Sequence, residues 1–212
     1  MKELASPAYL YEALPLETAW LQQVVPSGYP VGMMHAAAKA ELGLSGDIQV
    51  MAGMTDGCAS QIASGAVGPG EWNTTIGTTL VIKGVTRQEI TDPLGRLYSH
   101  RHPDAGTVDG CGWMPGGASN TGADWIAEDF AGDLEALNSQ ASSLMPTGKL
   151  AWPLVQKGER FPFIAPEARG FAPEGLSLAE RYTASLEGVA YVERLAYDMI
   201  RELSGEQMEA VY

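Results

Sequence analysis

The chain has 212 residues and a formal net charge of −13, and 45% of its residues are hydrophobic. This length and apolar content allow one large or two small folded domains, and they exclude an intrinsically disordered chain. A domain this acidic repels phosphate backbones, so we expect no nucleic-acid partner. The acidic residues are dispersed along the chain, which favours a role in solubility over a role as a binding patch.

Cysteine usage and hydropathy indicate the cellular compartment of the protein. Cys58 and Cys111 lack metal-ligand spacing, so they indicate a reducing compartment and are expected to be small buried hydrophobes. No apolar run reaches the roughly 18 residues that a membrane helix needs. The first 20 residues carry charges and prolines where a signal peptide needs an apolar core. These features predict a cytoplasmic protein with no membrane association.

The first quarter of the chain predicts short elements. Residues 35–44 are Ala-rich and predict a helix that ends at Gly43. Residues 47–54 are apolar and brief, which is typical of a buried strand. Residues 56–67 predict a helix that opens at Asp56, whose carboxylate would act as the N-cap.

The middle of the chain carries strand patterns. Residues 71–86 are rich in Thr, Val and Ile and predict a β-hairpin that turns near Gly77. Residues 95–102 predict a further strand, and the polarity of its two histidines is attributed to an exposed strand face. Residues 110–120 contain several glycines and are expected to form a loop that leads into a helix.

The last third is mainly helical. Residues 121–132 and 133–144 predict two short helices, and residues 146–176 are Pro/Gly-rich and predict loop with short strands. Residues 177–203 predict a long helix with a capping box and one apolar stripe. Helices and strands therefore mix along the whole chain, which favours an α/β or α+β fold.

Three features could bind a ligand or take part in catalysis, and each also has a purely structural interpretation. Asp56 follows a strand, where open α/β sheets bind ligands, but the local sequence alone favours a plain N-cap. Gly77 and Thr78 lie in a turn that can bind an anion through backbone N–H groups, or can simply close a hairpin. Gly117 precedes a helix whose N-terminus attracts phosphate, or belongs to an ordinary loop.

In combination, these features resemble the FGGY family of carbohydrate kinases. The order is a strand, Asp56, a small-residue helix, a Gly-Thr-Thr hairpin and a Gly-Gly loop. Residues 117–126 and 158–195 are similar to the pentulose kinase branch, which contains the xylulokinases and ribulose kinases. The resemblance implies a ribonuclease H-like, actin-type ATPase fold, of which this chain would hold a part.

The resemblance also implies roles for individual residues. Asp56 matches the catalytic acid, which contacts and deprotonates the sugar hydroxyl that receives phosphate. Gly77 and Thr78 match the Gly-Thr turn that binds ATP phosphates, and Gly117 matches a glycine beside those phosphates. The implied cofactors are ATP and Mg²⁺, with no protein residue assigned as a metal ligand. The implied substrate is a ketopentose, with D-xylulose as first choice and D-ribulose as second.

The resemblance divides the chain at residue 68. Residues 1–68 match the end of the family's N-terminal domain, and residues 69–212 match the larger part of its C-terminal domain. Neither the family's Asp-x-Gly-Thr phosphate hairpin nor its Gly-Gly-Gly adenosine motif is found. We therefore expect a central fragment that is inactive alone and that forms a homodimer through exposed apolar surface. The alternative is a non-catalytic, actin-like nucleotide-binding or scaffolding module.

Overall fold

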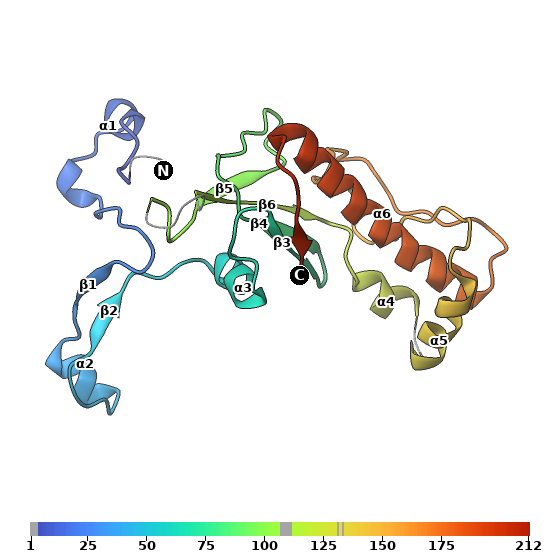
Figure 1. Cartoon of the computed structure of the whole chain (residues 1–212), viewed down its shortest axis with the longest axis horizontal. Helices are drawn as coiled ribbons and strands as arrows, with labels where there is room; N and C mark the ends of the chain where they lie inside the picture. Colours follow the sequence, from blue (N-terminus) through green and yellow to red (C-terminus); the bar gives the residue numbers. More distant parts are fainter. Residues whose placement is uncertain (1–3, 107–111, 131, 133) are drawn as a thin grey trace.

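A computed structural model describes residues 4–106, 112–130, 132 and 134–212. Cys111 lies outside these residues, so its predicted burial stays a prediction. The fold is a mixed α/β fold, as predicted, with helices on both sides of a mixed five-stranded sheet. Figure 1 shows this sheet at the centre of the molecule, with the N-terminal segment extending away from it.

The N-terminal segment contains short elements only. They are α1 (Tyr9–Ala13), the 3₁₀ helix η1 (Thr18–Trp20), β1 (Pro30–Met33), α2 (Ala36–Glu41) and β2 (Gln49–Met51). The strands β1 and β2 pair with each other in an antiparallel ribbon. All residues of β2 are exposed, so the prediction of a buried strand here is wrong. The reason is that no second layer within the described residues covers the ribbon.

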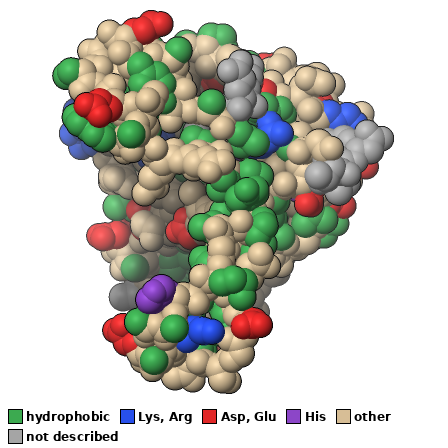
Figure 2. All heavy atoms as spheres, turned by 90° about the vertical axis from the view of Figure 1, so that its left-hand side faces the viewer, with side chains coloured by type: hydrophobic (Ala, Val, Ile, Leu, Met, Phe, Trp, Pro, Cys, Tyr) green, Lys and Arg blue, Asp and Glu red, His purple; other side chains and the backbone are tan. Residues whose placement is uncertain are grey.

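Hydrophobic side chains are therefore exposed on this segment. Figure 2 faces it and shows green side chains spread over the projecting part of the molecule. The exposed side chains include Tyr29, Val31, Met33, Val50 and Met51. Surface of this kind is typical of a contact with further protein, and the contact is a prediction for experiment.

The central sheet has the order β5-β6-β4-β3-β7. Its strands are β3 (Glu71–Ile76), β4 (Leu80–Gly84), β5 (Tyr98–Arg101), β6 (Trp113–Ser119) and β7 (Ala210–Val211). The neighbours β3/β4, β4/β6 and β5/β6 are antiparallel, and β3/β7 is parallel. The predicted hairpin at residues 71–86 and the predicted strand at residues 95–102 are thus confirmed.

One strand was not predicted. Residues 113–119 form β6 inside the sheet, so the prediction of a loop at residues 110–120 is wrong. The glycines there serve close packing. A β-carbon at Gly117 would lie 2.3 Å from the Phe161 ring, and one at Gly116 would lie 2.8 Å from Cγ of Lys83. Glycine in a strand interior often marks such a close approach.

Helix α6 (Leu178–Ser204) covers one face of the sheet and forms the main core with it. Its N-terminus has the predicted capping box, in which Ser177 and Glu180 satisfy each other's backbone N–H groups. The apolar stripe packs on alternate residues of the hairpin, because strand side chains alternate between faces. The core includes Trp72, Leu80, Ile82, Trp125, Phe161, Tyr182, Val189, Ala196, Met199 and Ile200.

Helices α4 (Asp124–Asp129) and α5 (Leu134–Leu144) lie beside α6, close to the predicted ranges. Helix α3 (Asp56–Ser64) contacts β3 and β4. It meets the sheet at Lys83, which points away from the α6 core because its neighbour Ile82 lies within that core. No helix in the described ranges is long and apolar enough to cross a membrane.

Candidate active site

Asp56 is the first residue of α3 and is exposed. The N-cap position is occupied by Thr55, which has extended dihedrals and makes no side-chain cap hydrogen bond. The prediction of Asp56 as the N-cap is therefore wrong by one residue. Its Oδ1 accepts a hydrogen bond from the Gly57 N–H at 2.7 Å. This contact orients the carboxylate at the helix start. Among the residues that the structure describes, none donates to the other oxygen, which can accept a ligand hydroxyl.

The Gly-Thr-Thr turn lies at the tip of the β3–β4 hairpin. The Gly77 N–H donates to the Thr79 carbonyl at 3.0 Å, which closes the turn. Gly77 and Thr78 are both exposed, and a β-carbon placed on Gly77 would meet nothing within 4 Å. The turn therefore presents open backbone, which is the property that a phosphate-binding turn requires.

Gly122 supports this turn from below, and sequence reasoning missed it. A β-carbon on Gly122 would lie 2.3 Å from the Thr78 carbonyl oxygen and 2.5 Å from that of Gly77. The Ala123 N–H donates to the Gly77 carbonyl at 2.7 Å. Gly122 is thus the glycine that lies beside the Gly-Thr turn. Its only signal in the sequence was its place before a helix.

Gly117, the predicted partner of the turn, lies elsewhere. It is buried in β6 and pairs with Ile82, on the face that packs against Phe161. Its contacts account for a packing role. Its predicted role beside ATP phosphates has no support from these contacts and stays a prediction.

A buried carboxylate holds the segment that carries Gly122. Glu159 accepts hydrogen bonds from the Ser119 hydroxyl at 2.8 Å, the Thr121 hydroxyl at 3.0 Å and the Asn120 N–H at 2.8 Å. Glu159 is 3% exposed. Buried polar groups of this kind are stable only when they are fully hydrogen-bonded, and here they fix the backbone that supports the turn.

Asp56 and the turn occupy two ends of one sheet face. Alternation along β4 places Val81 on the same face as Lys83, against which α3 begins, and Thr79 immediately precedes the strand. Val81 and Thr79 are both partly exposed, so this strip is open between the two ends. Lys83, which lies beside Gly57, and Thr79, which lies beside the turn, are four residues apart, or ~13 Å along an extended chain.

Two histidines lie beside the start of α3. A cavity of about 300 Å³ is lined by Thr55, Cys58, His100 and His102, among others. His102 is 2% exposed, so the attribution of its polarity to an exposed strand face is wrong. Its Nδ1 accepts a hydrogen bond from the Asp104 N–H at 3.1 Å. Burial lowers the pKa of both imidazoles, which favours neutral histidines at neutral pH.

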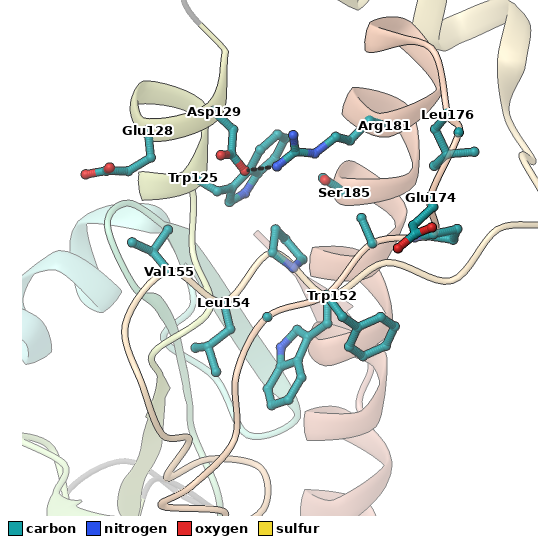
Figure 3. Close-up of a pocket in the computed structure, with 16 residues that line it drawn as sticks. Trp125, Glu128, Asp129, Trp152, Leu154, Val155, Glu174, Leu176, Arg181 and Ser185 are labelled. Carbon is teal, nitrogen blue, oxygen red and sulfur yellow. Dashed lines mark hydrogen bonds and ion pairs between the residues drawn. The ribbon is translucent and has the colours of Figure 1, made fainter.

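A larger cavity of about 610 Å³ lies between α4, α6 and the segments at residues 152–155 and 170–176. In Figure 3, Trp125 and Trp152 face it, and Arg181 is paired with Asp129 at its rim. The Trp125 indole donates to the Gly122 carbonyl at 2.9 Å. None of the predicted site residues lines this cavity, so its volume alone does not make it the reaction site.

Metal ligands are not grouped in the described part of the chain. No set of three or more His, Cys, Asp or Glu side chains there has the arrangement to hold a metal ion.

Comparison with known proteins shows which class of protein the chain resembles. The chain is 28% identical over 201 residues to the xylulose kinase of Staphylococcus epidermidis, with 89% of this chain and 38% of that protein covered. It is also 28% identical over 172 residues to the gluconokinase of Bacillus subtilis, with 71% of this chain and 32% of that protein covered. No family model matches the chain.

The fold agrees with the sequence comparison. The crystal structure of a xylulose kinase from Brucella ovis superposes with a TM-score of 0.81 at 21% identity, covering 97% of this chain and 43% of that one. The chain thus resembles the FGGY carbohydrate kinases in sequence, and it has part of their actin-like ATPase fold. It spans about two fifths of the length of the Staphylococcus epidermidis xylulose kinases that it matches.

Proposed function

We propose that this chain belongs to an ATP-dependent sugar kinase, in which Asp56 receives the acceptor hydroxyl and the Gly77–Thr78 turn holds the phosphates. The observation that carries this proposal is the shared sheet face. The exposed carboxylate of Asp56 lies near one end of this face. The open Gly77–Thr78 turn, which Gly122 supports, lies at the other end. The likeness to xylulose kinase and gluconokinase sequences supports the same reaction class.

The residues fit a nucleotide's phosphates. The turn is exposed, has no side chain at Gly77, and is fixed from below by Gly122 and Ala123. Bound ATP would supply the transferred phosphoryl group, with Mg²⁺ offsetting its charge. Backbone N–H groups at the turn, other than that of Gly77, which donates to the Thr79 carbonyl, would donate hydrogen bonds to phosphate oxygens. Their fixed position gives electrostatic stabilisation without reorganisation during the reaction.

Asp56 would act on the acceptor. Its Oδ1 is held by the Gly57 N–H, so the second carboxylate oxygen would accept a hydrogen bond from the sugar hydroxyl. Orienting that hydroxyl is its first task, and accepting the proton is its second, because the proton leaves late in a loose transition state. Transfer needs the sugar oxygen and the γ-phosphorus about 3 Å apart, so the sugar on Asp56 and the nucleotide on the turn would have to meet over the strip between them.

The proposed acceptor is a ketopentose, with D-xylulose as first choice and D-ribulose as second. The similarity to a xylulose kinase supports this choice. The similarity to a gluconokinase makes gluconate the competitor that an assay must include. Residues 1–212 alone are proposed to be inactive, because they span 38% of that xylulose kinase. The division at residue 68 and the homodimer stay predictions, and sedimentation analysis tests the latter.

The experiment is a coupled ADP-release assay of the full-length protein with Mg·ATP and a panel of D-xylulose, D-ribulose, gluconate and glycerol. We expect turnover with a pentulose and its loss in Asp56→Asn. If the protein consumes no ATP with any acceptor, the alternative of a non-catalytic actin-like module is preferred. Calorimetric titration with Mg·ATP then separates a nucleotide-binding module from a scaffold.

A further inference from the structure

Lys83 is a buried lysine with a pocket made for it. It lies in β4 and is 5% exposed. Two glycines from different elements leave room for its side chain. A β-carbon on Gly57 would be 3.1 Å from Lys83 Cε, and one on Gly116 would be 2.8 Å from Cγ and 3.4 Å from Nζ. Neither glycine has a left-handed φ, so space for Lys83 is what these positions require.

The ammonium group of Lys83 has weak partners. Its Nζ donates to the Cys58 sulfur at 3.9 Å and lies 5.2 Å from the centre of the Tyr98 ring. Among the residues that the structure describes, no carboxylate forms an ion pair with it. A thiol and an aromatic ring compensate poorly for the water that a buried ammonium loses.

Folding alone does not account for this arrangement. Lysines are almost never fully buried unless they are paired. An apolar residue of similar length would fill the channel between Gly57 and Gly116 without the desolvation cost. A cation near a helix N-terminus is also unfavourable, since that end of the helix carries partial positive charge. A charge kept at such a cost is a candidate for a functional role.

The location of Lys83 suggests the role. Its side chain passes under Gly57, the residue that follows Asp56 and orients its carboxylate. The start of α3 therefore lies over a fixed positive charge. We propose that Lys83 is a positioning residue, and this proposal rests on the proposed function. Its buried ammonium offsets the negative charge that gathers around Asp56 when a phosphoryl group approaches the acceptor hydroxyl.

The physical basis is electrostatic preorganisation. Asp56 and phosphoryl oxygens repel each other, and the repulsion rises as water leaves a closing site. A cation that is already fixed and desolvated lowers this repulsion without moving during the reaction. Lys83 need not touch the substrate for this effect. It acts across the space between its ammonium group and Asp56, and its contacts with Gly57 and Gly116 fix the position of that ammonium group.

Two variants separate the charge from the packing. Lys83→Met keeps an unbranched side chain only one heavy atom shorter and removes the charge. We expect it to raise the melting temperature of the full-length protein by a few degrees, because the desolvation cost disappears. We expect kcat to fall on the order of tenfold or more, with the KM of the sugar little changed. A lower melting temperature or an unchanged kcat overturns the proposal.

The second variant, Lys83→Ala, empties the channel for chemical rescue. Added n-propylammonium replaces the missing atoms and charge, and 1-propanol replaces the volume alone. The proposal requires rescue of kcat by the ammonium and not by the alcohol, and equal rescue by both overturns it. If the unmodified protein phosphorylates no sugar, the proposed function fails. The melting comparison of Lys83→Met with the unmodified protein still decides whether the lysine is kept for stability.

Discussion

Gly122 lies directly beneath Thr78, so closely that a β-carbon would be 2.3 Å from the Thr78 carbonyl oxygen. This contact joins the loop before α4 to the tip of the β3–β4 hairpin. The adjoining hydrogen bond from Ala123 to Gly77 fixes the same turn. The shape of the proposed phosphate site thus depends on a glycine more than 40 residues away in the sequence.

Gly122→Ala should displace the turn and raise the KM for ATP at least tenfold, with a smaller effect on the KM of the sugar. The reason is that backbone atoms at this distance cannot yield as a flexible side chain does. Steady-state kinetics with each substrate varied in turn checks this. Equal changes in both constants would point to general damage to the fold.

Gly77→Ala is the companion variant, because the space around Gly77 is open and its φ is not left-handed. We expect an unchanged melting temperature together with a raised KM for ATP, since the new methyl group would obstruct only an approaching ligand. Thermal unfolding and the ATP titration are measured on the same preparation. Normal use of ATP by Gly77→Ala would remove the turn from the phosphate site.

Asp92 provides a pH-dependent test of the fold. Its carboxylate accepts hydrogen bonds from Arg96 Nε at 2.9 Å and Nη2 at 3.0 Å. The hydrogen bonds from the Arg96 side chain are the main cause that lowers the pKa of Asp92 from 3.8 to about 2. The folded-state pKa is depressed, so this contribution to stability is complete above the unfolded pKa. It is lost as the pH falls through the folded one.

Asp92→Asn should therefore lower the free energy of unfolding by about 2 kcal/mol at neutral pH. The difference from the unmodified protein should shrink between pH 4 and pH 2, the window that the two pKa values define. Urea unfolding at several pH values measures both quantities. A difference that stays constant down to pH 2 would show that the ion pair does not titrate as described.

Ser177→Ala tests the start of α6. The hydroxyl accepts the Glu180 N–H at 3.2 Å, as part of the capping box. Its removal should cost ~1 kcal/mol of stability. Ser142→Ala, on the exposed surface of α5, serves as the control and should change stability by less than about 0.5 kcal/mol. Equal losses in the two variants would argue against a specific capping effect.

Local patterns predicted the local structure well. The capping box and apolar stripe of α6 and the Thr-rich hairpin of β3 and β4 depend on neighbours in sequence, and both are confirmed. The start of α3 was predicted within one residue. The mistake was the cap itself, because Thr55 and Asp56 are both common in that position and only the dihedrals distinguish them.

Long-range packing was not visible in the sequence. Gly116 and Gly117 look like loop residues, but they lie in β6. Glycine is needed at these two positions because Lys83 and Phe161 occupy the space that a side chain would fill. Gly122 was passed over for the opposite reason. Its importance comes from a contact with the hairpin tip, which no local pattern encodes. Residue type indicated where backbone approaches closely, and only the fold shows what it approaches.

The central claim is that Asp56 receives the hydroxyl of a sugar in an ATP-dependent kinase. Asp56→Asn keeps an oxygen that can accept the Gly57 N–H, so the fold should be unchanged. The decisive measurement compares kcat with D-xylulose for the unmodified full-length protein and for Asp56→Asn, at equal melting temperatures. We predict measurable turnover and a loss of at least ~10²-fold, the scale of a positioned acid–base group. Near-normal turnover in Asp56→Asn would contradict the assignment.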